Sequence, residues 1–278
     1  MHYFYLSLVV FAITACSNVK KSDRELVKNL QDFNVPGIKK ELERDIHPGQ
    51  EGEFFLTFAF FDACSKGDVK RVKELLAAGS NIHAVTSLGK TALHLACESE
   101  GPSTELVKLL LDKGLDINGN FKTPSSVEKF DWSPLAIACV HKNTEVAVLL
   151  MERGANIEEK DAGGDTPLLK ASRYGAIKII EELLKRNANV KAVDNEGNTA
   201  LHNAFSGYAT KNLLFPSFSD PYSEEDFEKI MDLLLDYGAD IYAENNEHKT
   251  VKDLIQDFKK FIVGRTNVLD PAVSIPRT

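Results

Sequence analysis

The feature that most constrains this 278-residue chain is a 33-residue unit at positions 161–193, DAGGDTPLLKASRYGAIKIIEELLKRNANVKAV. Thr166-Pro167 predicts the start of a helix, because proline is tolerated at the first helical position. Gly175 predicts a break, and the apolar residues after it recur at helical spacing. Asn187 is expected to end this second helix in a left-handed conformation. Such a unit has too little core to fold alone.

The unit recurs with the same period. Thr199 follows Thr166 by 33 residues, and Ser133 precedes Thr166 by 33. The equivalent segments are TALHLA (91–96), SPLAIA (133–138), TPL (166–168) and TALHNA (199–204). Their second halves also agree, as in LVKLLLDKGLDIN (106–118), VAVLLMERGANIE (146–158) and IMDLLLDYGADIY (230–242).

A period near 33 with T-P-L-H-like segments resembles the ankyrin repeat. The resemblance implies an all-α solenoid of helix–turn–helix repeats with β-turn fingers, in which each repeat contacts only its neighbours. We expect about five repeats plus a C-terminal capping repeat over residues 53–264, followed by a flexible tail at 265–278. Spacing between equivalent residues indicates two insertions, one in the finger at 118–132 and one in the fifth repeat at 208–226.

The N-terminus suggests export. Residues 1–15, MHYFYLSLVVFAITA, contain no Asp, Glu, Lys or Arg and suit a signal peptide. The following Cys16 completes the sequence Ile-Thr-Ala-Cys, which resembles the lipobox of bacterial lipoproteins and implies a lipid anchor, such as palmitate, at Cys16. The usual positive n-region is missing, so a buried N-terminal helix or strand is the alternative. Residues 16–52 are then expected to form a lipidated tether with short helices.

The net charge and the positions of the cysteines argue against several classes of function. A net charge of −8 argues against a nucleic-acid binder, which needs a basic face. Cys64, Cys97 and Cys139 each follow an alanine at the same place in three repeats. Equivalent atoms of stacked helices lie roughly 8–10 Å apart, which is too far for a disulfide. We therefore expect buried free thiols, and we expect no metal and no cofactor.

The histidines and turns carry no catalytic pattern. His94 and His202 occupy the histidine of the T-P-L-H motif, and the resemblance implies that each ties a finger backbone to a helix. The sequence contains no nucleophile elbow, phosphate loop or H-E-x-x-H motif. We expect a non-catalytic monomer that binds another protein.

The resemblance implies that partners contact the fingertips and the exposed face of each first helix. The fingertip positions are Lys90, Trp132, Asp165, Asn198 and Lys249. The first-helix positions are Glu98, Ser99, Val140, His141, Arg173 and Tyr174. Trp132, beside Phe130, is the best single candidate because tryptophan is enriched at binding hot spots. Alternatively, the longer finger folds back and buries both rings.

These observations predict a protein-recognition module at the periplasmic face of the bacterial outer membrane. A specific version is an inhibitor or immunity protein for an envelope-active toxin or enzyme. Two alternatives remain open: a secreted, host-directed effector, and an enzyme or stress factor with its site in the insertions 118–132 and 208–226.

Overall fold

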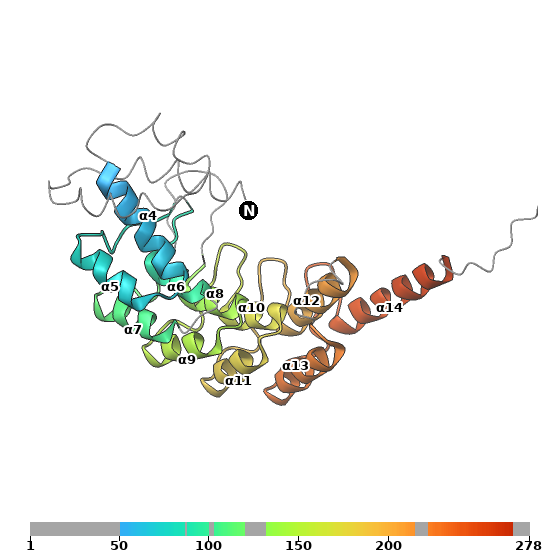
Figure 1. The fold of residues 1–278 in the computed structure, drawn as a ribbon. Helices are drawn as coiled ribbons and strands as arrows, with labels where there is room; N and C mark the ends of the chain where they lie inside the picture. The colour runs from blue at the N-terminus through green and yellow to red at the C-terminus, as the bar shows by residue number, and fades with distance from the viewer. Residues whose placement is uncertain (1–50, 87, 100–102, 120–131, 215–221, 269–278) are drawn as a thin grey trace, which may run out of the picture. The chain divides into compact units, whose positions relative to one another are not determined.

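The computed structural model describes residues 51–86, 88–99, 103–119, 132–214 and 222–268. Over this part of the chain it contains eleven α-helices and one isolated antiparallel bridge, between Val85 and Thr91 (Figure 1). The chain divides into two compact units, Met1–Asn156 and Ile157–Thr278. Both units consist of helix pairs joined by fingers, as the repeat pattern predicts.

The first unit contains three helix pairs. They are α4 (Glu51–Ser65) with α5 (Val69–Ala77), α6 (Ala92–Glu98) with α7 (Thr104–Asp112), and α8 (Pro134–Val140) with α9 (Thr144–Glu152). The first helices form one layer, in which α6 packs between α4 and α8. The second helices form an outer layer, in which α7 contacts α9.

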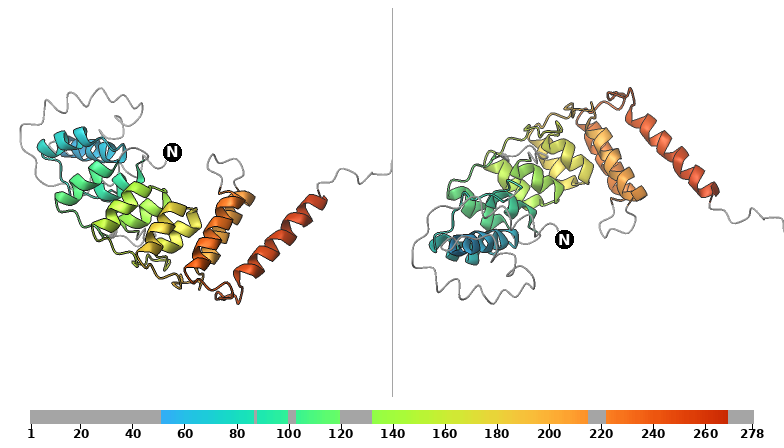
Figure 2. Two further views of the ribbon diagram at one scale, coloured as in Figure 1. Left: turned by 90° about the horizontal axis from the view of Figure 1, so that it is seen from below. Right: turned by 90° about the horizontal axis from the view of Figure 1, so that it is seen from above.

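The second unit contains two helix pairs and a final helix. They are α10 (Pro167–Tyr174) with α11 (Ile177–Lys185), α12 (Ala200–Leu214) with α13 (Glu224–Asp236), and α14 (Val251–Val268). Helix α12 packs against both α10 and α14, and α11 contacts α13. Figure 2 shows α14 flanking the α12–α13 pair.

The helix boundaries follow local sequence signals. The Thr166 hydroxyl accepts a hydrogen bond from the Leu169 N–H, and Pro167 occupies the first turn of α10. Helix α10 ends at Gly175, whose φ of 72° is left-handed. Asn187, with φ 61°, adopts the predicted left-handed conformation after α11. These caps satisfy backbone groups that a helix terminus leaves without partners.

Small side chains line the packed face of the first helices. Cys64, Cys97 and Cys139 are fully buried free thiols, which confirms that prediction for the described residues. Burial raises the pKa of Cys64 to about 12 and raises that of Cys97 further. These cysteines therefore act as small apolar residues. The second helices bury larger side chains on one face, as α11 does with Ile179, Ile180, Leu183 and Leu184.

The insertion at 208–226 lengthens the helices of the fifth repeat. Helix α12 has 15 residues and α13 has 13, whereas α10 and α11 have 8 and 9. Tyr222 precedes α13 and is 1% exposed. Its hydroxyl donates to the carbonyl oxygen of Ser172 at 3.1 Å, so the insertion is attached to the end of α10. Burial raises the pKa of this hydroxyl above its usual range.

Several predictions lie outside the described residues. They are the signal peptide, Cys16, the tether up to residue 50, most of the long finger including Phe130, and the last ten residues. Helix α14 reaches Val268, so the expected boundary between cap and tail falls inside a helix. No helix in the described part of the chain combines the length and apolarity needed to cross a bilayer.

Candidate protein-binding surface

The fingers of the second unit are closed by tight turns. The N–H of Gly164 donates to the Asp161 carbonyl oxygen at 2.9 Å, and Gly197 repeats this contact with Asp194 at 3.1 Å. Both glycines have positive φ, 80° and 76°, which costs little for a residue without a side chain. This confirms the β-turn fingers that the repeat resemblance implies.

Asparagine side chains join each finger to the next. The backbone N–H of Asn195 donates to Gly163 O and its side-chain amide donates to Ala162 O, both at 2.9 Å. One repeat later, the backbone N–H of Asn246 donates to Glu196 O at 2.9 Å, and its side-chain amide donates to Asn195 O at 3.1 Å. Three successive fingers are therefore connected by the same pair of hydrogen bonds.

Buried histidines connect helices to fingers. The backbone N–H of Thr91 donates to His94 Nδ1 at 3.1 Å, so the ring proton lies on Nε2, which donates to Trp132 O at 3.1 Å. Burial is the largest cause that lowers the pKa of His94 to about 3. His202 repeats the arrangement with Lys249 O at 2.9 Å. The structural role implied for both histidines is confirmed.

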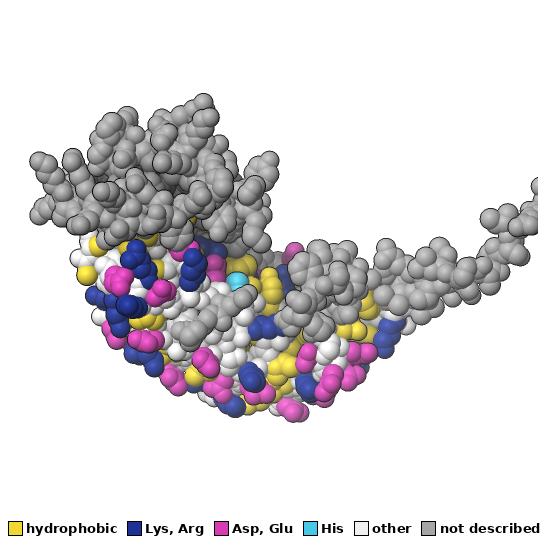
Figure 3. Space-filling view, viewed as in Figure 1, with side chains coloured by type: hydrophobic (Ala, Val, Ile, Leu, Met, Phe, Trp, Pro, Cys, Tyr) yellow, Lys and Arg dark blue, Asp and Glu magenta, His cyan; other side chains and the backbone are white. Residues whose placement is uncertain are grey.

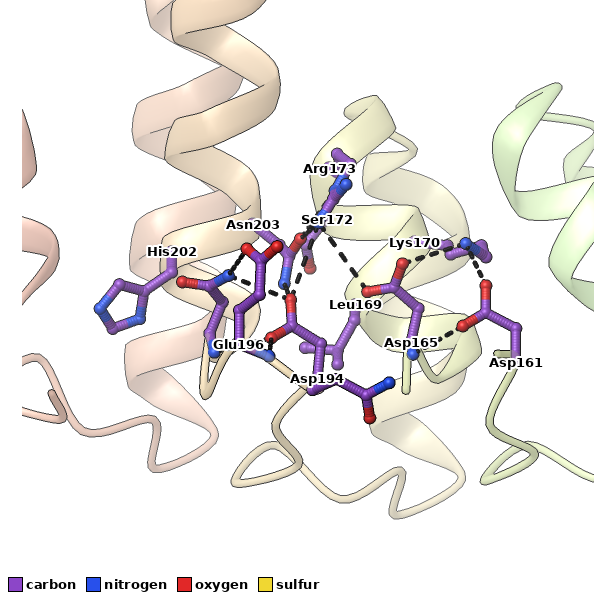
Figure 4. Close-up of polar contacts among 12 residues, drawn as sticks. Asp161, Asp165, Leu169, Lys170, Ser172, Arg173, Asp194, Glu196, His202 and Asn203 are labelled. Atoms are coloured by element: carbon purple, nitrogen blue, oxygen red, sulfur yellow. Dashed lines mark hydrogen bonds and ion pairs between the residues drawn. The ribbon is translucent and has the colours of Figure 1, made fainter. Parts of the chain in front are cut away.

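A buried lysine pairs with two finger carboxylates in the second unit (Figure 4). Lys170, only 4% exposed, places Nζ 2.6 Å from Asp161 Oδ2 and 3.1 Å from Asp165 Oδ2. Two buried carboxylates sharing one ammonium leave a negative balance. One oxygen of Asp165, Oδ1, has no hydrogen-bond partner. This cluster joins α10 to its own finger.

Arg173 lies beside this cluster and extends it to the next repeat (Figure 4). Its Nε donates to Asn203 Oδ1 at 2.7 Å, and its Nη2 lies 3.7 Å from Asp194 Oδ2 and 4.0 Å from Asp165 Oδ1. The Asn203 amide in turn donates to Asp194 at 3.3 Å. The guanidinium is therefore held in place while 38% of the side chain stays exposed.

A pocket of about 570 Å³ opens between the last two described fingers, α12 and α14. Asn198, His202 and Asn203 are among the polar residues that line it, and Phe205 and Leu254 supply apolar surface. Glu196 and Glu247 stand at the fingers that border it. Within the described residues, no group of three or more His, Cys, Asp or Glu side chains is placed to hold a metal ion.

Two of the predicted contact residues are not exposed. Ser99 is 5% exposed, because it caps α6 next to Gly67 and its carbonyl oxygen accepts a hydrogen bond from Asn143. Asp165 is 8% exposed, because its carboxylate faces Lys170. The expectation that these two side chains form an accessible surface was wrong.

The other predicted residues differ in accessibility. His141 is exposed, whereas Trp132, Val140, Arg173, Tyr174 and Asn198 are half-buried. Lys90 pairs with Glu98, and Lys249 Nζ lies 2.8 Å from Asp257. Both ion pairs reduce the availability of these lysines. Binding through any of these residues remains a prediction.

Sequence reasoning missed Lys170, Asp161 and Asn203 as a connected group. The available signal was the position of Lys170 inside a helix otherwise buried on that face, between Leu169 and Ala171. A lysine there needs a buried partner, because an unpaired charge in the interior is costly. Asp165 and Asp161, five and nine residues before Lys170, were the aspartates available as partners.

These features define an all-α repeat protein, and charged side chains of both signs lie on the face of the described residues that Figure 3 shows. A family model described as ankyrin repeats, in three copies, matches residues 60–161 and 156–245. The chain belongs to the ankyrin-repeat family and has its solenoid fold. Proteins of this family are generally non-catalytic modules for binding other proteins.

Curated relatives share the repeats over part of their length. The chain is 36% identical to the B-cell lymphoma 3 protein homolog of Mus musculus over 48% of the chain and 29% of that protein. It is 30% identical to Protein glp-1 of Caenorhabditis elegans over 54% of the chain and 12% of that protein. It is 27% identical to the phosphocholine transferase AnkX of Legionella pneumophila over 68% of the chain and 19% of that protein. The chain thus spans less than a third of each of these relatives.

Proposed function

We propose that this chain recognises another protein through the surface of its second unit that is formed by the fingers and the inner helices α10 and α12. Family membership supports a protein partner. The hydrogen bonds between successive fingers support a preformed surface, because they fix the loops before a partner arrives. Binding to a surface that is already ordered costs less conformational entropy.

Arg173 is the observation that carries this proposal. Its guanidinium is positioned by Asn203 and two nearby carboxylates, yet 38% of the side chain remains exposed. An arginine held this way has little rotamer freedom left to lose on binding. Arginine is also among the residues enriched at energetic hot spots. Arg173 is thus a ready contact for a partner's carboxylate or backbone carbonyl groups.

Photo-crosslinking tests which face is used. A photoreactive phenylalanine analogue replaces Tyr174, a half-buried residue next to Arg173 on α10. The matched control replaces Lys178, an exposed residue of the outer helix α11. We expect a discrete adduct from position 174, weakened by Arg173→Ala, and none from position 178. Adducts from position 178 alone would place recognition on the outer helices and contradict the proposal.

We further propose that the protein is held at the bacterial envelope by acyl chains on Cys16. The charge-free run at 1–15 and the Ile-Thr-Ala-Cys sequence support this proposal. Cys16→Ala should abolish labelling with palmitate and release the protein from the detergent phase, whereas Cys64→Ala should change neither. Full-length protein that begins at Met1 and takes up no palmitate would refute the anchor.

At this location, we propose that the partner is an envelope-active toxin or hydrolytic enzyme that binding inhibits. The partner recovered by crosslinking at position 174 is purified, and its activity is measured with added wild-type or Arg173→Ala protein. Inhibition by the wild type and weaker inhibition by the variant are expected. Full partner activity at saturating wild-type protein would contradict an inhibitory role and leave simple recognition in place.

A further inference from the structure

We infer that the pocket between the last two described fingers, α12 and α14 accepts a lysine or arginine side chain of the partner protein. This inference rests on the proposed recognition function and specifies the chemistry that one part of the recognition surface binds. The pocket, at about 570 Å³, is large enough for a long side chain. The charged and apolar residues that line it favour a basic side chain.

The pocket lining carries two carboxylates. Glu196 and Glu247 line the pocket, and no lysine or arginine does. Both residues are exposed. Glu196 accepts a hydrogen bond from the Asn198 side-chain amide at 3.1 Å, and this neutral donor adds no positive charge. No ion pair joins either carboxylate to a cation in the described part of the chain.

The neighbouring cations are already engaged elsewhere. Lys249 belongs to the same finger as Glu247, and its Nζ lies 2.8 Å from Asp257 on α14. Arg173 is directed to Asn203 and lies 3.7 Å from Asp194. Lys249 also interacts electrostatically with Glu247, but it is already paired with Asp257, so the two pocket carboxylates are not fully balanced. A cationic side chain is therefore favoured here, whereas a carboxylate or phosphate would meet two like charges.

The interior matches the body of a basic side chain. Phe205 and Leu254 supply apolar surface, and the Ser206 hydroxyl supplies a polar contact on α12. Lysine and arginine bury their methylene groups on apolar surface while the charged end stays near water. A purely apolar side chain would use the interior but desolvate the two carboxylates. Apolar lining residues together with two carboxylates therefore favour a basic side chain.

The experiment titrates ¹⁵N-labelled full-length protein with acetyl-Ala-Ala-Arg-Ala-Ala-amide. The comparison peptide carries citrulline, which keeps the shape of arginine without its charge. A third peptide carries glutamate, and spermidine serves as a small basic ligand. Glu196→Gln/Glu247→Gln removes the proposed charges. The matched control, Glu152→Gln/Glu228→Gln, removes two exposed carboxylates from the outer helices α9 and α13.

The arginine peptide should shift the backbone amides of Glu196, Ser206 and Asn246. It should bind up to about fivefold more tightly than the citrulline peptide, because one exposed ion pair contributes at most about 1 kcal/mol. The pocket variant should lose this preference and the control should keep it. Equal binding of arginine and citrulline peptides, preference for glutamate, or equal loss in the control overturns the inference. Spermidine binding as tightly as the arginine peptide would indicate a small-molecule site and overturn it as well.

Failure of this inference is distinguishable from failure of the proposed function. If crosslinks form at position 174 but the peptides show no charge preference, the surface formed by the fingers, α10 and α12 binds a protein without using this pocket for a basic side chain. If no crosslinks form at position 174, recognition by this surface itself is contradicted.

Discussion

Gly207 lies so close to the carbonyl oxygen of Arg173 that a Cβ atom on Gly207 would overlap this oxygen. This contact brings α12 against the end of α10, at the place where Tyr222 also attaches. Ala171 and Ala204 are both fully buried, and their small side chains let α10 and α12 approach closely along the rest of their contact. The side chain of Arg173 is thus presented from a helix end that is fixed by backbone contact.

Gly207→Ala should destabilise the second unit strongly. The added methyl group meets backbone rather than a movable side chain, so the helices must separate. Overpacking usually costs about 1–3 kcal/mol, and a backbone clash belongs at the upper end. Urea unfolding measures the loss. Ser206→Ala, at an exposed neighbouring position, should change stability little. A Gly207→Ala protein as stable as Ser206→Ala would show that α10 and α12 do not pack this closely.

Lys170→Met should also destabilise the protein, through charge rather than shape. The change removes the ammonium shared by Asp161 and Asp165 and leaves buried carboxylates without it. Breaking a buried ion pair on one side costs about 3–5 kcal/mol. Lys178→Met, on the exposed face of α11, is the control. Equal unfolding free energies for the two variants would mean that the aspartates are solvated.

His94 should make stability depend on pH. Its folded pKa of about 3 lies below the ordinary value of about 6.5, so its contribution is complete above about pH 6.5 and is lost as pH falls toward 3. Between pH 7 and pH 5 the wild type should lose about 2 kcal/mol more than His94→Asn, which has no imidazole to protonate. Urea unfolding at both pH values tests this difference. Parallel losses in the two proteins would show that His94 titrates normally.

The buried thiols should resist alkylation until the chain unfolds. Cys64 has its pKa raised to about 12, and all three described cysteines are buried. Thiolate is the reactive form, so both its scarcity and burial slow the reaction. Iodoacetamide at pH 8 should spare these residues in the native protein and label them in guanidinium chloride. Ser206→Cys supplies an exposed thiol that should react in the native state. Rapid native labelling of Cys97 would contradict its placement in the core.

Much of the fold was predictable because the repeat imposes local signals at fixed spacing. Thr166 and Pro167 mark a helix start by hydrogen-bond chemistry, and Asn187 marks an end by its tolerance of positive φ. The thiol positions were predictable because equivalent residues occupy equivalent places in a stack. None of these inferences required knowledge of contacts between distant residues.

The candidate site was less predictable because it depends on such contacts. Asp165 was expected at an accessible fingertip, yet Lys170 turns inward and buries it. Tyr222 lies in an insertion whose length says nothing about its hydrogen bond to Ser172, 50 residues earlier. Asn195 and Asn246 are residues of a type common in turns. Only the spacing of the folded fingers brings each side-chain amide to a carbonyl oxygen of the preceding finger.

The asparagine connections between fingers bear on the speed of recognition. Loops that are already joined need no closing step after a partner arrives, so association should depend on diffusion and orientation. Changes to single contact residues should then alter the dissociation rate far more than the association rate. Replacing Asn246, which holds one finger to the next, is the change that should slow association.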